Sequence, residues 1–322
     1  MRDNMIISPG SDRDDHEPSR RALPLGTQVV TLAPISTAGG RVVSAGTVAV
    51  VVAQPDSNGR PYRVRFPNGE EGVVAPDEID VRAHLQRAGL EADPAPAVRD
   101  SLFAHVIYRC VVGSRAYGLD EEGSNTDRRG IYAPPAERHW SLHGVPEQLE
   151  DEATQETYWE VQKFLVLALK ANPNVLECLY SPLVETVTPM ARDLLDMRHI
   201  FLSRLVYQTY NGYVLSQFKK LEQDLRARGH IRWKHAMHLI RLLLAGVTTL
   251  REGVVPVRVE EHRTRLLAIR RGELPWAEID AWRLRLHREF DAAFAATRLP
   301  ARPDYARADA YLIAVRRDMA QR

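Results

Sequence analysis

Two kinds of hydrophobic spacing divide the chain, with short alternating runs near its start and helical spacing in its second half. Runs rich in β-branched residues cover positions 27–33, 46–53, 62–66 and 71–75, and Gly-containing turns separate them. Short strands joined by such turns are typical of small antiparallel barrels. We therefore predict a small β-barrel over residues 25–83.

The central stretch combines strand-like runs with a helical pattern. An apolar run at residues 106–112 leads into a Gly-Ser pair, a short turn-and-helix segment and a second strand that ends before two prolines. Residues 156–161 resemble a strand, and apolar positions at 161, 164, 165, 168 and 169 then follow the spacing of a helix that buries one face. We predict an α/β domain over residues 98–189.

Helical spacing dominates residues 190–322. Breakers rich in Gly and Pro separate five predicted helices, at 190–221, 233–251, 259–271, 276–297 and 305–317. Residues 1–24 are polar and charged and are predicted to be disordered. Residues 84–97 are predicted to hold the end of a short helix, which begins near residue 79, and a linker with two prolines. The predicted fold class is therefore α+β and multidomain: an N-terminal barrel, a central α/β domain and a C-terminal helical domain.

The Gly-Ser pair and the polar residues after it suit a triphosphate. Gly113 allows the backbone to approach closely, N–H groups at a helix start bind anions, and Ser114 adds a hydroxyl. Asn125 and Asp127 are two residues apart, so on a strand they point to the same face. Oxygen ligands placed in this way suit Mg²⁺, which also bridges to substrate phosphates. The alternative is a simple turn followed by a polar strand end.

This stretch resembles the nucleotidyltransferase signature of the DNA polymerase β superfamily, in which Gly-[Gly/Ser] is followed after about ten residues by Asp-x-[Asp/Glu]. The segments Gly-Ser-Arg-Ala-Tyr-Gly-Leu and Ser-x-x-Asp-Arg-Arg-Gly are more closely similar to a bacterial group of predicted nucleotidyltransferases. So are the segments Tyr-Trp-Glu-Val-Gln-Lys-Phe and Asn-Pro-Asn-Val-Leu-Glu-Cys-Leu. That group usually has Ser-Asp-x-Asp at the second motif, and this chain has Asn125 where the first aspartate is expected.

The resemblance implies further site residues. Polymerase-β-type enzymes take a third carboxylate from the strand that precedes the helix at 161–169, and the expected position is Gln155 here. Glu156 and Glu160 are near, so the third acid is Glu156 or Glu160, or it is missing; the alternative for each is a solvated surface charge. Arg115 would neutralise phosphate charge or form a structural salt bridge.

A basic stripe in the predicted helix at 233–251 forms a further candidate. Lys234, His238 and Arg241 are spaced i, i+4 and i+7 and fall on one face. Arginine is well shaped for bidentate phosphate contact, so a stripe that faces the Gly-Ser pair would hold phosphates. The alternative is a solvated face that contacts no ligand.

Composition narrows the class of partner. The net charge is +1, which gives no bulk electrostatic case for nucleic acid or membrane. The barrel region resembles SH3-like or KOW-like barrels, but residues 26–81 contain four arginines against six acidic residues, so a protein-docking role is favoured over RNA binding there. Two cysteines in apolar runs, no apolar run long enough to span a membrane and no signal-peptide core together predict a cytoplasmic protein.

Two functions from different classes follow. In the first, the chain is an enzyme that transfers a nucleoside monophosphate from an NTP, with ATP as the expected nucleotide, to a hydroxyl of protein, RNA or a small molecule. Mg²⁺ or Mn²⁺ would bind Asp127 and Asn125, with Glu156 as a further catalytic acid, and Gly113, Ser114 and Arg115 would hold phosphates. In the second, the chain is a nucleotide-binding or regulatory module on a degenerate nucleotidyltransferase fold. RNA binding as the sole function is the third and weakest hypothesis.

Overall fold

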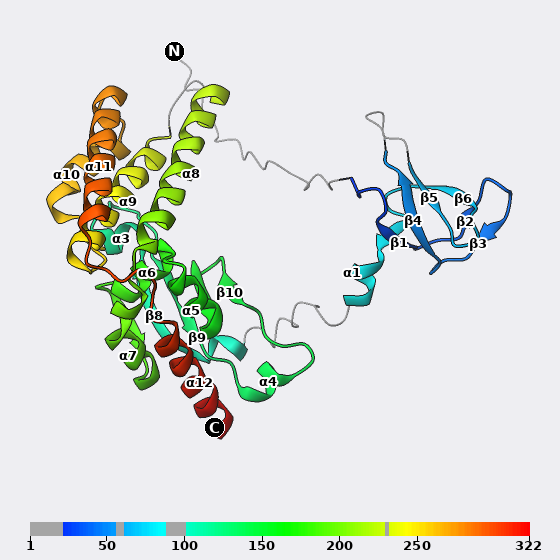
Figure 1. Cartoon of the computed structure of the whole chain (residues 1–322), viewed down its shortest axis with the longest axis horizontal. Helices are drawn as coiled ribbons and strands as arrows, with labels where there is room; N and C mark the ends of the chain where they lie inside the picture. The colour runs from blue at the N-terminus through cyan, green and yellow to red at the C-terminus, as the bar shows by residue number, and fades with distance from the viewer. Residues whose placement is uncertain (1–21, 56–60, 88–100, 229–231) are drawn as a thin grey trace, which may run out of the picture. The chain divides into compact units, whose positions relative to one another are not determined.

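The structure is a computed structural model, and it describes residues 22–55, 61–87, 101–228 and 232–322. The chain divides into two compact units, Met1–Ala92 and Asp93–Arg322, both drawn in Figure 1. Most of the predicted disordered segment 1–24 and of the linker within 84–97 lies outside the described residues. In the described ranges, no helix is long and apolar enough to cross a membrane.

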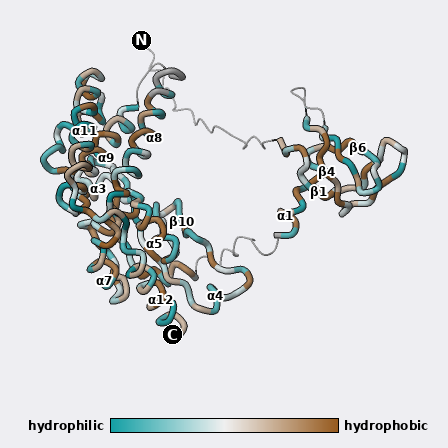
Figure 2. The backbone as a smooth tube through the Cα atoms, viewed as in Figure 1, coloured by the Kyte–Doolittle hydropathy of each residue, from teal (hydrophilic) through white to brown (hydrophobic). Residues whose placement is uncertain are grey.

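The first unit contains a five-stranded antiparallel sheet in the order β6-β5-β4-β1-β7. Its strands are β1 (Gln28–Thr31), β4 (Val48–Ala53), β5 (Tyr62–Arg65), β6 (Glu71–Val74) and β7 (Ile79–Val81). A two-stranded hairpin is formed by β2 (Ile35–Ser36) and β3 (Val42–Val43), and helix α1 (Arg82–Arg87) follows the sheet. Alternate residues such as Val29, Val64 and Val74 are fully buried, and Figure 2 shows the hydrophobic character of β1 and β4.

The four strands predicted in this unit are confirmed as β1, β4, β5 and β6, but the predicted closed barrel is wrong. Among the described residues no strand pairing joins β6 to β7, so the sheet is open. The outer edge of β6 instead meets the β2 hairpin through a bridge between Thr37 and Gly72. The sequence pattern also assigned residues 79–81 to the start of a helix, whereas they form β7 and pair with β1.

The second unit is built on a mixed sheet in the order β10-β11-β9-β8-β12. Its strands are β8 (Val106–Val112), β9 (Asp127–Tyr132), β10 (Gln148–Asp151), β11 (Glu156–Glu160) and β12 (Val184–Val187). The β9–β11 pair is parallel, and the other neighbouring strands are antiparallel. Short helices α3 (Gly113–Tyr117) and α4 (Ala136–Trp140) lie in the connections.

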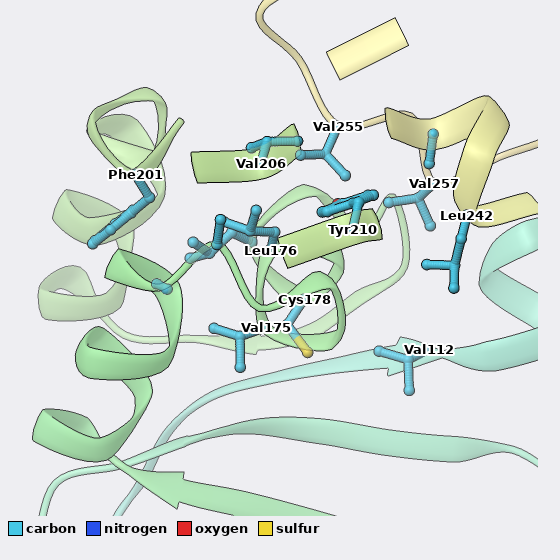
Figure 3. Close-up of a cluster of buried hydrophobic side chains, with 14 of the residues drawn as sticks. Val112, Val175, Leu176, Cys178, Phe201, Val206, Tyr210, Leu242, Val255 and Val257 are labelled. Carbon is cyan, nitrogen blue, oxygen red and sulfur yellow. The ribbon is translucent and has the colours of Figure 1, made fainter. Parts of the chain in front are cut away.

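Two helices pack on this sheet and form its core layer. Helix α5 (Val161–Leu169) follows β11, and the side chain of Asn172 accepts a hydrogen bond from the N–H of Asn174 to begin α6 (Pro173–Tyr180). Figure 3 shows Val175 and Cys178 of α6 in the same hydrophobic cluster as Val112 of β8, together with Tyr210 and Leu242 from later helices. The helix predicted at 161–169 is therefore confirmed.

The remaining helices complete the second unit. They are α7 (Pro189–Asp196), α8 (Leu205–Arg228), α9 (Trp233–Glu252), α10 (Arg263–Arg270), α11 (Trp276–Ala296) and α12 (Tyr305–Gln321), with 3-10 turns at Arg198–Phe201 and Glu260–His262. The single helix predicted at 190–221 is interrupted. Ser203 is buried and its hydroxyl accepts a hydrogen bond from Leu205 N, which starts α8 anew, while Arg204 N donates to Pro300 O.

An ion pair attaches α12 to the end of the sheet. Glu160, the last residue of β11, is 6% exposed, and its Oε1 lies 2.7 Å from Arg316 Nη2 of α12. Its Oε2 accepts a hydrogen bond from Gln162 N and caps α5. Both carboxylate oxygens of Glu160 are thus used to hold helices.

Candidate nucleotide-binding site

The turn after β8 brings Gly113 against the carboxylate of Asp127. Val112 pairs with Asp127 across the β8–β9 ladder, so the two strands place Gly113 and Asp127 side by side. Gly113 has φ +70°, and a Cβ added to it would lie 2.7 Å from Asp127 Oδ2. Any other residue would be strained and would also push the carboxylate away. The predicted closeness of Gly113 and Asp127 is therefore present in the fold.

Arg115 holds the loop that precedes Asp127. Its Nη2 donates a hydrogen bond to Ser124 O at 2.8 Å, and its Nε donates to Asn125 O at 3.3 Å. Among the described residues, its guanidinium thus contacts backbone carbonyls rather than an acidic side chain. Asn125 itself is exposed and lies before β9, which begins at Asp127. The predicted position of Asn125 on that strand is therefore wrong, because Asn125 lies in the loop before it.

The strand next to β9 gives Asp127 no carboxylate on its own face. Arg129 pairs with Thr157 and Ile131 pairs with Trp159, so Thr157 and Trp159 share the face of Asp127. Glu156 pairs with Arg128 and belongs to the opposite face, because neighbouring residues on a strand alternate. Its Oε2 accepts a hydrogen bond from Tyr158 Oη at 2.6 Å, and its Oε1 lies 3.8 Å from Arg109 Nη1. The register therefore does not direct the Glu156 carboxylate toward Asp127.

Glu160 and Gln155, the other two positions considered for a third acid, do not supply a carboxylate to Asp127 either. Glu160 is committed to Arg316 and to the cap of α5, as described above. Gln155 lies just before β11, where its carbonyl accepts a hydrogen bond from Arg128 N, and it lines a hollow together with Asp127. The position expected to carry the third acid is thus beside Asp127, but its side chain is an amide.

Two hollows meet at Asp127 and Arg129. The first has a volume of about 120 Å³ and is lined by Val112, Gly113, Tyr117, Asp127, Arg129, Asn174 and Glu177. The second, of about 200 Å³, is lined by Asp127, Arg129, Glu150, Asp151, Glu152, Gln155, Glu156 and Thr157. The first hollow is therefore bounded by the Gly-Ser turn and by α6, and the second by the β10–β11 hairpin.

A buried ion pair forms the back wall of the first hollow. Arg241 of α9 is 5% exposed, and its Nη1 donates to Glu177 Oε1 at 2.5 Å. The guanidinium carbon lies 3.8 Å from the ring centroid of Tyr117, and Tyr117 Oη donates to Glu177 Oε2 at 2.6 Å. Burial raises the pKa of the Tyr117 hydroxyl well above its usual range, so it remains a donor. Arg241, Glu177 and Tyr117 thus link α9, α6 and α3.

The predicted basic stripe on α9 is not a uniform surface. Arg241 is buried with its charge already matched by Glu177, so it is neither solvated nor free for a phosphate. Burial, with Arg241 and Lys234 adding to the effect, lowers the pKa of His238 to about 3, so this imidazole is neutral at physiological pH. Of the three residues only Lys234 is exposed.

The resemblance to polymerase-β-type enzymes implies a divalent metal, and the residues around Asp127 do not fit a metal site that is formed before nucleotide binds. Mg²⁺ is held by carboxylate oxygens together with substrate phosphates. On β9 and β11, Asp127 is the one carboxylate that the register directs to this face, and Glu150 shares the face from β10, opposite Thr157. Asn125 and Gln155 offer neutral amides, and Arg129 adds a positive charge. Across the described part of the chain, no group of three or more His, Cys, Asp or Glu side chains is arranged to hold a metal ion.

Sequence reasoning missed Arg129, Tyr117 and Glu177. Arg129 carried a usable signal, since it lies two residues after Asp127 and a strand places such residues on one face. Glu177 is a single acid within the apolar run at residues 175–180, which is a weaker signal of a buried partner. Nothing in the sequence pairs Glu177 with Arg241.

Comparison with known proteins agrees with this architecture. A model of the RlaP family, described as an RNA repair pathway DNA polymerase beta family, matches residues 87–314. An uncharacterized protein of Bacillus subtilis (strain 168), YcgL, is 32% identical over 169 residues, which are 51% of this chain and 64% of that relative. The match thus covers less than two thirds of the relative, and no solved structure matches. Because the family model covers well over half of the sequence, the chain belongs to the RlaP family of DNA polymerase β-type proteins.

Proposed function

We propose that the hollow lined by Gly113 and Asp127 binds the phosphates of a nucleoside triphosphate. The observation that carries this proposal is the close approach of the two residues, with the Asp127 carboxylate 2.7 Å from the place of a Gly113 Cβ. A glycine with φ +70° allows the backbone turn to lie against Asp127, and the Arg129 guanidinium supplies donors to the same hollow. Ser114, the next residue in the chain, would add a hydroxyl donor. ATP is the first nucleotide to test.

Transfer of a nucleoside monophosphate to a hydroxyl acceptor is the second candidate function. It is favoured by family membership and by Asp127, which keeps its place opposite Val112. Amides at Asn125 and Gln155 count against a fast reaction, because a phosphoryl-transfer centre relies on charge that holds metal ions and stabilises the transition state. The family description favours RNA among the acceptors, with protein and small molecules as the others.

The N-terminal sheet is proposed as a docking module for a protein partner. Its hydrophobic cluster is separate from the cores of the second unit, and a hollow of about 450 Å³ lies on it next to Val50, Val52 and Phe66. Both cysteines of the chain are free and buried, which agrees with a protein of the reducing cytoplasm.

Nucleotide binding and nucleotide transfer are separated by two measurements on the full chain. Calorimetric titration with each common NTP tests the hollow, and we expect at least one to bind with a Kd on the order of micromolar. Incubation with the same labelled nucleotide, Mg²⁺ and RNA or lysate tests transfer, and we expect slow or no labelling. Absence of binding by every NTP would overturn the proposed site, and labelling at about 1 s⁻¹ or faster would favour the enzyme.

A further inference from the structure

Arg129 is a half-buried cation that forms no ion pair among the described residues. It projects from β9 on the face of Asp127, because Cys110 and Val112 on the neighbouring strand pair with Arg129 and Asp127. Its guanidinium carbon lies 5.7 Å from the ring centroid of Trp159. Among the described residues, its guanidinium forms no ion pair and no hydrogen bond with a side chain. Partly buried charges are normally paired, so this guanidinium is suited to an anionic ligand.

The adjacent arginine shows the contrast. Arg128 projects from the other face of the sheet, where its Nε lies 2.8 Å from Glu185 Oε2. The ion pair with Glu185 raises the pKa of the Arg128 guanidinium. Two consecutive arginines of one strand therefore have different surroundings, and among the described residues the one on the Asp127 face forms no ion pair.

The charge balance of the first hollow is also unusual for a site that must attract a metal ion. Arg241 neutralises Glu177 on the back wall, and the free charges left on the lining are Asp127 and Arg129. Their sum is zero. Within the first hollow a divalent cation gains little attraction from the lining, whereas a phosphate group is repelled by Asp127 no more than it is attracted by Arg129.

We propose that Arg129 binds a phosphate group of the nucleotide and that this chain takes up a nucleoside triphosphate without a divalent cation. The inference rests on the proposed nucleotide site and adds which protein group offsets the negative charge of the nucleotide phosphates. A guanidinium presents paired N–H donors that match two phosphate oxygens, and it is permanently charged. It therefore supplies, from the protein, positive charge that related sites obtain from a metal.

The experiment is calorimetric titration of the full chain with ATP and with inorganic tripolyphosphate, each in EDTA and in Mg²⁺. For the unaltered protein we expect the ATP Kd in EDTA to equal that in Mg²⁺ within about threefold. Arg129→Ala and the milder Arg129→Gln should each weaken binding in EDTA by roughly tenfold or more, the scale of a lost charge-assisted contact. Arg128→Ala is the matched control, with the same charge removed from the opposite face, and it should leave the Kd unchanged.

The outcomes separate this inference from the proposed function. ATP binding that requires Mg²⁺, or binding in EDTA that is the same in both Arg129 variants and the unaltered protein, would overturn the inference and leave the nucleotide site standing. Absence of binding in both buffers would overturn both. Tripolyphosphate binding that is lost with Arg129 would support phosphate recognition, and binding of ATP but not of tripolyphosphate would assign affinity to the nucleoside and overturn it. Tryptophan fluorescence confirms that each variant is folded.

Discussion

Replacing Arg241 with alanine should destabilise the second unit strongly. The change removes the counter-charge of Glu177, which is 2% exposed, and leaves its carboxylate with a single donor, the hydroxyl of Tyr117. It also removes the guanidinium that covers the Tyr117 ring. This expectation differs from the one that the spacing of charges on α9 supports, in which Arg241 contacts phosphate and its loss weakens nucleotide affinity.

The magnitude follows from burial. Breaking a buried ion pair by removing one partner costs about 3–5 kcal/mol, because an uncompensated charge remains in the interior. For a unit of this size each kcal/mol shifts the melting temperature by about 2–4 °C, so Arg241→Ala should lower it by roughly 6–20 °C. Lys234→Ala, an exposed change on the same helix, should alter stability by no more than about 0.5 kcal/mol.

Tryptophan fluorescence is the appropriate measurement. All five tryptophans lie between residues 140 and 282, so their emission reports on the Asp93–Arg322 unit and not on the N-terminal sheet. Thermal and urea unfolding of the full chain should be followed for Arg241→Ala, for Lys234→Ala and for the double change Arg241→Met with Glu177→Leu. The double variant should recover much of the lost stability, because it leaves no unpaired charge in the interior and fills the space with apolar side chains of similar volume.

A melting temperature for Arg241→Ala within about 2 °C of the unaltered protein would refute this reasoning. It would mean that Glu177 is hydrated or protonated without large cost. A double variant that is less stable than Arg241→Ala would refute the second step, since the stability would then depend on the ion pair itself.

Three further expectations concern the site and its surroundings. Gly113→Ala should weaken ATP binding by roughly tenfold or more, whereas Gly118→Ala, with the same φ of +70° and no atom within 4 Å of its added methyl, should cost similar stability and leave the Kd unchanged. The pKa of His238 is lowered to about 3, so its imidazole stays neutral in the folded chain, while the unfolded chain binds a proton below about pH 6.5. The free energy of unfolding therefore decreases as the pH is lowered from about 6.5 toward 3. Urea unfolding should show a loss of roughly 2 kcal/mol between pH 7 and pH 5 that His238→Gln lacks. Asn125→Asp combined with Gln155→Asp should produce Mg²⁺-stimulated pyrophosphate release, and no stimulation would contradict the assignment of these positions to metal binding.

Local patterns predicted much of the fold. The strands at β4, β5 and β8 and the helices α5, α9 and α11 follow from hydrophobic spacing, because each buries one face along a continuous stretch. The split of residues 190–221 did not follow, since Ser203 interrupts an apolar run without Gly or Pro. The open sheet of the first unit did not follow either, because pairing between distant strands is not encoded in the period of any one strand.

The candidate site was likewise predicted only where its residues lie close together in the sequence. Gly113 and Asp127 were predicted because a motif of short range fixes both, and the β8–β9 ladder then brings them together. Glu177 and Arg241 are separated by 64 residues, and neither spacing nor composition identifies such a partner. The charge stripe on α9 was visible in the sequence, but its burial depends on where α3 and α6 pack.

The ion pair between Glu160 and Arg316 has a consequence for how this unit is delimited. Similarity to the family extends to residue 314, which lies inside α12 and before the arginine. A domain that ended at residue 314 would lack Arg316, the ion-pair partner of Glu160. The Glu160 side chain would still cap the N-terminus of α5. The smallest unit in which the buried Glu160 keeps its ion-pair partner therefore extends past the region that matches the family, to at least Arg316.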